Sequence, residues 1–194
     1  MKNTINNKQL KKLNACKSRY DVFFEAHGEK TVTLLDVLES NGVKDVLWLI
    51  DEQDKTTTQA DDVMLLGADF AENVLHFFES KFPGDLRPRA AINGVRDFFL
   101  GKISKHRLKE LRIDAADAAR AARSAYDVAY DVAACAAARS AYGAAYNAAC
   151  GAAAYADAAY GAARSAYAAA YAAAERQFQT NKLREMLIKW ENEA

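Results

Sequence analysis

The chain has 194 residues, of which 51% are hydrophobic, so it is long enough to bury the core of one ordinary domain. Its 26 lysine and arginine residues balance its 26 aspartate and glutamate residues, which leaves no formal net charge at pH 7. This balance argues against nucleic acid as a partner and against a mimic of nucleic acid, because each needs a strong excess of one charge.

The three cysteines are an odd number at wide spacing, and they predict free thiols in a reducing compartment rather than a disulfide framework. Cys16, Cys135 and Cys150 are expected to be small buried residues. The polar N-terminal sequence lacks the apolar stretch of a signal peptide, and the longest uncharged run, residues 140–156, is too weakly apolar to span a membrane. We therefore expect a cytoplasmic protein without a membrane partner.

Apolar residues recur at helical spacing along the N-terminal half of the chain. After a frayed segment at residues 1–7, we expect helices over residues 9–26, 34–40, 43–53, 59–82 and 87–102. Thr31 or Thr33 can cap the second helix, and Asn41-Gly42 ends it. The Pro-Gly-Asp sequence at residues 83–85 predicts a turn, with Asp85 as the N-cap of the helix that follows.

The two longest of these helices have clear apolar faces. The face of the 59–82 helix comprises Val63, Leu66, Phe70, Val74, Leu75 and Phe78, and that of the 87–102 helix comprises Ala91, Ile92, Val95, Phe98, Phe99 and Leu100. No segment alternates apolar and polar residues with the period of a β-strand. The predicted fold is therefore all-α, a single multi-helix bundle.

An alanine- and tyrosine-rich tract, residues 114–174, dominates the C-terminal half. Of its 61 residues 33 are Ala and 8 are Tyr, so a helical conformation is strongly favoured. One helix from residue 104 to residue 190 would exceed roughly 120 Å, several times a domain diameter. We expect the tract to fold back into antiparallel helices, with breaks at residues 127–131 and 151–155, before an amphipathic helix over residues 175–193.

The phase of the tyrosines supports this folding back. On one straight helix Tyr126, Tyr130 and Tyr155 would lie on one side, and the remaining five tyrosines of the tract on the other. Composition accordingly divides the chain into a helical subdomain with large core residues at 1–103 and an Ala/Tyr-rich helical subdomain at 104–194, packed as one domain.

Motifs of catalysis are missing from the sequence. His27, His76 and His106 have no metal-ligand spacing around them, and there is no phosphate-binding glycine loop and no nucleophile elbow. We therefore predict no catalytic residues, no metal and no cofactor, and a protein that is not an enzyme.

One polar phrase, ARSAY, occurs three times in the tract. In each copy an arginine precedes two tyrosines by three and seven residues, which places the three side chains on one helical face. Arginine and tyrosine are common anchors of protein interfaces, so these residues are candidate partner contacts. They are Arg123, Tyr126 and Tyr130, then Arg139, Tyr142 and Tyr146, then Arg164, Tyr167 and Tyr171. The alternative is that the tyrosines fill gaps between alanine-rich helices.

Arg87 and Arg89, which flank Pro88, are a second pair of candidates. They could bridge the bundle to an acidic partner, or they could fix the turn that follows Pro83.

Two passages resemble a known family. The sequence DLRPRAAINGVRDFFLGKIS at residues 85–104, followed by an alanine-rich helical tail, resembles the immunity-protein family linked to bacterial polymorphic-toxin systems. Residues 13–50, which include Cys16 and Trp48, are similar to the opening of alanine-rich bacterial and phage relatives. The tail differs in carrying tyrosine where histidine is common in that family. The resemblance implies binding to a toxin or a defence-system protein and supplies no catalytic residues.

Three hypotheses follow for the function. The first is an inhibitor, immunity-like or phage-encoded against host defence, that blocks a bacterial toxin or defence effector by steric occlusion. The second is a scaffold whose alanine-rich faces join copies of the chain into a homo-oligomer. The third is a sponge that binds a nucleotide immune signal in a tyrosine-lined pocket.

Overall fold

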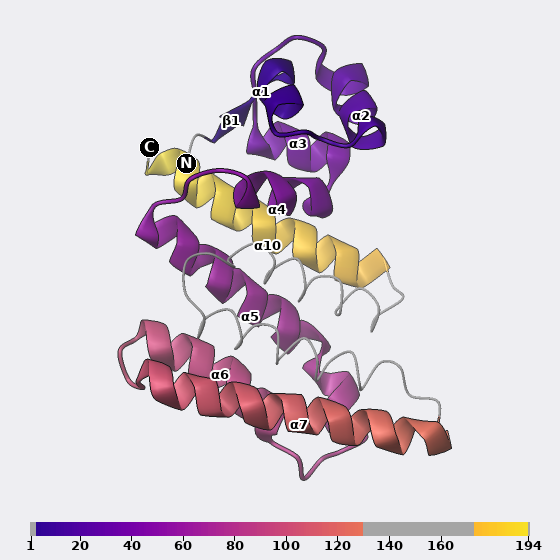
Figure 1. Cartoon of the computed structure of the whole chain (residues 1–194), viewed down its shortest axis with the longest axis vertical. Coiled ribbons are helices and arrows are strands. Elements are labelled where there is room, and N and C mark those ends of the chain that lie inside the picture. Colours follow the sequence, from indigo (N-terminus) through magenta and orange to yellow (C-terminus); the bar gives the residue numbers. More distant parts are fainter. Residues whose placement is uncertain (1–2, 130–172, 194) are drawn as a thin grey trace. The chain divides into compact units, whose positions relative to one another are not determined.

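The computed structural model describes residues 3–129 and 173–193, and the side chains of residues 3–121 and 176–193 (Figure 1). Eight helices and one small sheet make up these residues, and the predicted all-α fold class is confirmed. The elements are β1 (Thr4–Ile5), α1 (Asn7–Lys12), α2 (Lys17–His27), β2 (Val32–Thr33), α3 (Leu34–Asn41), α4 (Val43–Asp51), α5 (Thr57–Glu79), α6 (Arg87–Phe99), α7 (Lys105–Ala129) and α10 (Ala173–Asn192).

The chain divides into two compact units. Unit 1 comprises residues 1–59 and 178–194, and unit 2 comprises residues 60–177. The two units are defined by contacts between segments of the chain. The expected subdomains at 1–103 and 104–194 were defined by composition instead, and they stay a prediction.

Residues 3–7, expected to be frayed, are ordered, and that expectation was wrong. Thr4 and Ile5 pair antiparallel with Thr33 and Val32, and the Ile5 side chain is 1% exposed. Pairing satisfies the backbone groups of this short segment while its one large apolar side chain joins the core of unit 1.

The helix expected over residues 9–26 is two helices. Asn14 adopts a left-handed backbone with φ 57°, the one non-glycine residue with positive φ among the described residues. Asparagine tolerates this conformation better than most residues, and it ends α1 so that α2 can start in a new direction. The break leaves Cys16 as the N-cap of α2, where its free thiol is exposed rather than buried as predicted.

Helices α3 and α4 follow the predicted signals closely. Thr33 caps α3 in a box with Asp36, each side chain accepting from the backbone N–H of the other residue. Gly42, with φ 82°, ends α3 and begins α4, a conformation that favours glycine. Four residues of α4 are then buried almost completely: Val46, Leu47, Leu49 and Ile50.

Unit 2 is built around α5, α6 and α7. All six residues of the predicted α5 face are at most 5% exposed, and Ala91, Ile92 and Val95 of α6 are at most 1% exposed. Leu100 was wrongly assigned to the α6 face, because α6 ends at Phe99 and Leu100 is 66% exposed. Gly94 lets α7 approach α6 closely, because a Cβ at this position would lie 2.4 Å from Leu111 Cδ1. Ser104 accepts from the backbone N–H of Arg107 at the start of α7.

Helix α10 supplies the C-terminal part of unit 1. Its buried side chains include Leu183, Leu187 and Trp190, and Arg184 pairs with Glu39 of α3 at 2.6 Å. The break expected at residues 127–131 extends past residue 129, where the first described range ends, and the break expected at residues 151–155 lies outside the described ranges. Cys135 and Cys150 lie outside them as well.

Candidate functional site

A row of ion pairs joins the polar sides of α5 and α6. Arg96 Nη2 lies 2.7 Å from Asp69 Oδ1 and 2.6 Å from Glu72 Oε2. Arg89 Nη1 lies 3.7 Å from Glu72 Oε1, and Arg89 Nη2 donates to Glu79 Oε2 at 2.7 Å. We call these five residues the charge ladder.

Helical spacing explains why the ladder forms. Asp69, Glu72 and Glu79 lie three and seven residues apart on α5, and Arg89 and Arg96 lie seven apart on α6, so each set occupies one side of its helix. Glu72 contacts both arginines and therefore links the two halves of the ladder. The hydrogen bond from Arg89 holds the pKa of the Glu79 carboxyl below its ordinary value, although burial acts in the opposite direction.

Arg87 is held by the turn that precedes α6. Its Nε and Nη2 donate to the two oxygens of Asp85 at 2.8 and 2.6 Å, and the Arg87 backbone N–H donates to Asp85 Oδ1 at 3.2 Å. These bonds lower the pKa of the Asp85 carboxyl. Asp85 was predicted as the N-cap of α6, but that prediction was wrong, because Leu86 is the N-cap. Asp85 lies one residue earlier and accepts the hydrogen bonds from Arg87 in the first turn.

The structure thus gives Arg87 and Arg89 partners inside the chain. These pairings are what the turn-fixing alternative requires, while the role of both residues in partner binding stays a prediction. Of the other predicted contacts, Arg123 and Tyr126 lie in α7 with side chains outside the described set. The remaining seven, Tyr130, Arg139, Tyr142, Tyr146, Arg164, Tyr167 and Tyr171, lie outside the described ranges.

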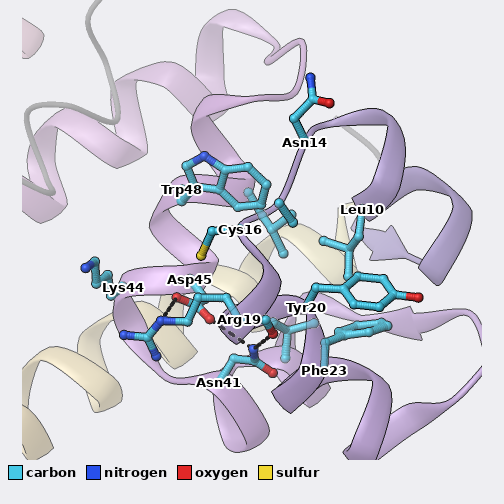
Figure 2. Close-up of a pocket in the computed structure, with 13 residues that line it drawn as sticks. Leu10, Asn14, Cys16, Arg19, Tyr20, Phe23, Asn41, Lys44, Asp45 and Trp48 are labelled. Atoms are coloured by element: carbon cyan, nitrogen blue, oxygen red, sulfur yellow. Dashed lines mark hydrogen bonds and ion pairs between the residues drawn. The ribbon is translucent and has the colours of Figure 1, made fainter.

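A cavity of about 270 Å³ in unit 1 was not predicted (Figure 2). It is lined by residues of α1, α2, α3, α4 and the turn between α1 and α2, among them Cys16, Arg19, Asp45 and Trp48. Sequence patterns could not reveal it, because each helix contributes only one to four residues and the turn at Asn14 brings them together.

The described residues form neither a metal site nor a membrane-spanning helix. Within residues 3–129 and 173–193, no group of three or more His, Cys, Asp or Glu side chains has the arrangement of a metal site. The helices of the same ranges include none with the length and hydropathy needed to cross a membrane.

Comparison with known proteins identifies the family of the chain. A family model described as "Imm-5 like putative immunity protein" matches residues 49–186, well over half of the chain. The chain belongs to this immunity-protein family. The predicted resemblance is confirmed, and family membership indicates a toxin-neutralising role with a toxin as the partner. Neither the curated proteins nor the solved structures include a significant match.

The segment matched to the immunity family has a definite place in the structure. It runs from the end of α4 into α10, so it contains the charge ladder, the Arg87–Asp85 turn and all three ARSAY phrases. Leu49 is the one cavity-lining residue inside it, and the other lining residues precede it.

Proposed function

We propose that this immunity-family protein neutralises a bacterial toxin or defence effector by binding it and blocking its working surface, without catalysing a reaction. The match to the immunity family over residues 49–186 carries the proposal. The proposal includes a cytoplasmic location. It also includes the alternative that the protein is encoded by a phage and acts against the defence system of the bacterial host.

The proposed contact surface is formed by the ARSAY phrases. All nine arginine and tyrosine residues lie within the matched segment, and tyrosine and arginine supply large contact area with strong directional bonds. Arg87 and Arg89 are secondary contacts in this proposal, since each guanidinium is already bonded to a carboxylate and would add to an interface at its exposed edge.

The charge ladder supports this role as a brace. It joins α5 to α6, which also share the apolar core of unit 2, and so stiffens two helices that precede the tract. A stiff scaffold reduces the entropy that a binding surface loses when a partner docks.

Affinity capture with matched variants tests the surface. The sixth residue after each ARSAY arginine follows the first tyrosine of the phrase by three residues, the spacing of neighbours on a helix, which gives three equivalent substitutions, Ala129→Arg, Ala145→Arg and Ala170→Arg. The tagged chain captures an effector from a bacterial lysate, and the purified effector is then titrated with each variant. We expect at least one substitution to weaken binding by about tenfold or more, as loss of a buried anchor does.

Glu25→Arg, on the exposed part of α2, is the control and should bind normally. If all three substituted chains keep their helical circular dichroism and bind the effector with unchanged affinity, the ARSAY phrases are not the contact surface. An effector that binds the chain and keeps its full activity would refute neutralisation itself.

A further inference from the structure

The cavity of unit 1 has a largely apolar wall. Four of the side chains that line it, Leu10, Phe23, Val37 and Leu49, are at most 4% exposed. They come from four different helices, α1 to α4, and lie around a space of about 270 Å³. Water in a space with such a wall finds few hydrogen-bond partners, so an apolar molecule can replace it with a gain in free energy.

An aromatic ring is left partly open in this cavity. Trp48 keeps an intermediate exposure, although the adjacent Leu49 is 1% exposed. Figure 2 shows the indole beside Cys16, with Tyr20 and Phe23 further along the cavity. Aromatic pairs attract each other beyond the effect of the area that they bury, so this lining favours an aromatic molecule.

The charged groups that line the cavity already have partners. Asp45 has a side chain that is 10% exposed, and Arg19 Nε lies 3.5 Å from its Oδ1. Asn41 Nδ2 donates to Asp45 Oδ2 at 2.9 Å and to the Arg19 carbonyl at 3.1 Å. Lys44, the remaining charged residue of the lining, is exposed and has an interaction partner of its own in the chain.

This pairing disfavours a charged ligand. An anion in the cavity would lie near the Asp45 carboxylate, and a cation would lie near the Arg19 guanidinium. Either ion would lose its water shell without gaining a free partner, or it would have to separate Asp45 from its cation, which is costly at a buried carboxylate. An uncharged molecule meets neither cost, because it uses only the apolar and aromatic part of the wall.

The volume of the cavity sets the size of the ligand. A cavity of about 150 Å³ with an apolar lining is large enough for benzene. The cavity of unit 1, at about 270 Å³, therefore has room for two fused rings, the size of indole or naphthalene.

We propose that the cavity of unit 1 binds a small uncharged aromatic molecule of one or two rings, with its ring between Trp48 and the buried apolar side chains. This site goes beyond the proposed toxin neutralisation, because all its lining residues except Leu49 precede the segment matched to the family. No effector takes part in its test, so a failure there would leave the neutralisation proposal unaffected.

Three naphthalene derivatives of similar shape test the selection by charge on the full chain. 2-Naphthylmethanol is uncharged, 2-naphthoate is an anion, and 2-naphthylmethylammonium is a cation at neutral pH. We expect 2-naphthylmethanol to bind with a dissociation constant on the order of 0.1–1 mM, as ligands of this size reach in apolar sites. Both ions should bind about tenfold more weakly or worse, because their charges lose water without gaining a free partner.

Trp48 and Cys16 report where the probe binds. The chain has two tryptophans, so its ¹H–¹⁵N spectrum contains two indole signals, from Trp48 and from Trp190. Trp190 is 2% exposed and does not line the cavity. We expect 2-naphthylmethanol to shift the Trp48 signal and to leave the Trp190 signal in place. It should also slow the alkylation of Cys16, whose exposed thiol lines the cavity, as measured on the Cys16 peptide by mass spectrometry.

A matched pair of substitutions tests the location independently. Ala15 lines the cavity at an intermediate exposure, so Ala15→Phe places a ring in the space that the ligand would take. Ala26→Phe makes the same change at an exposed position of α2 outside the cavity. We expect the Trp48 shift to be lost in the Ala15→Phe chain and kept in the Ala26→Phe chain.

Selective binding of 2-naphthylmethanol that is lost in the Ala15→Phe chain supports the proposal. The proposal is overturned if 2-naphthylmethanol neither shifts the Trp48 signal nor slows alkylation, or if either ion binds as tightly. Equal shifts of the Trp48 and Trp190 signals would overturn it too, because the probe would then bind without a defined site. Unchanged binding to a folded Ala15→Phe chain has the same consequence. If circular dichroism shows that this variant does not fold, the charge series on the parent chain still decides.

Discussion

Glu72 and Arg96 lie 2.6 Å apart and join α5 to α6, two helices that also share the apolar core of unit 2. Arg96 also pairs with Asp69, so one guanidinium holds two turns of α5. The two side chains, Arg96 and Glu72, are 30% and 41% exposed, which screens the interaction but does not remove it.

A double-mutant cycle with Arg96→Gln and Glu72→Gln measures this pairing. We expect a coupling free energy of about 0.5–1 kcal/mol in urea unfolding, because networked and partly buried pairs lie at the upper end of surface ion pairs. The matched cycle on Arg107 and Glu110, whose side chains are 52% and 46% exposed within one helix, should give a smaller coupling. Equal couplings in the two cycles would show that the ladder does not join the helices.

Gly94→Val tests the close approach of α6 and α7. Even the first added carbon would lie 2.4 Å from Leu111 Cδ1, so we expect a loss of about 1–3 kcal/mol from overpacking. Leu111→Ala removes the obstructing methyl groups, and the double variant should therefore be more stable than the sum of the single effects predicts. Additive effects in thermal or urea unfolding would mean that the helices are not in contact at this position. Gly84→Ala, in open space, is the control.

Acid should weaken unit 2 through Glu79 and Asp85. Arginine partners lower the pKa of both carboxyls from ordinary values of 4.5 and 3.8. The stabilisation is therefore complete above the ordinary values and is lost as the pH falls through the lowered folded-state values. Between about pH 6 and about pH 3, the Glu79→Gln, Asp85→Asn variant should lose less free energy of unfolding than the parent chain. Parallel pH profiles would contradict the assignment.

Asp61 should behave in the opposite way. Burial, assisted by the neighbouring charge of Asp62, raises the pKa of the Asp61 carboxyl above its ordinary value of 3.8. A raised folded-state pKa means a contribution that is present below the ordinary value and lost as the pH rises through the folded value. Asp61→Asn should therefore stabilise the chain at neutral pH and have less effect in acid. The same gain at both pH values would show that the carboxylate charge is not the cause.

Local signals in the sequence predicted the helices well. Thr33 with Asp36, Gly42 and Ser104 mark helix ends through bonds to near neighbours, and the apolar face of α5 follows from spacing alone. The break at Asn14 was missed, because the apolar residues on both sides of it continue the helical spacing. The pairing of Ile5 with Val32 was missed because it joins segments 27 residues apart.

The charge ladder and the cavity could not be predicted from residue spacing, because both depend on how the helices pack against one another. Seven-residue spacing of Arg89 and Arg96 could have indicated a charged face on α6, but the match to Glu72 depends on how α6 lies against α5. The cavity depends on several helices and the turn at Asn14 meeting around Trp48. The ARSAY phrases remain a prediction from the sequence, since their side chains lie outside the described set.

The activity of the captured effector, titrated with the purified chain, tests the central claim most directly. Neutralisation by binding predicts that activity falls linearly and is abolished at a fixed, near-equimolar ratio, with the intact masses of both proteins unchanged. Loss of activity at a small fraction of that ratio, or a change in the mass of the effector, would show that the chain acts as a catalyst and would contradict the account.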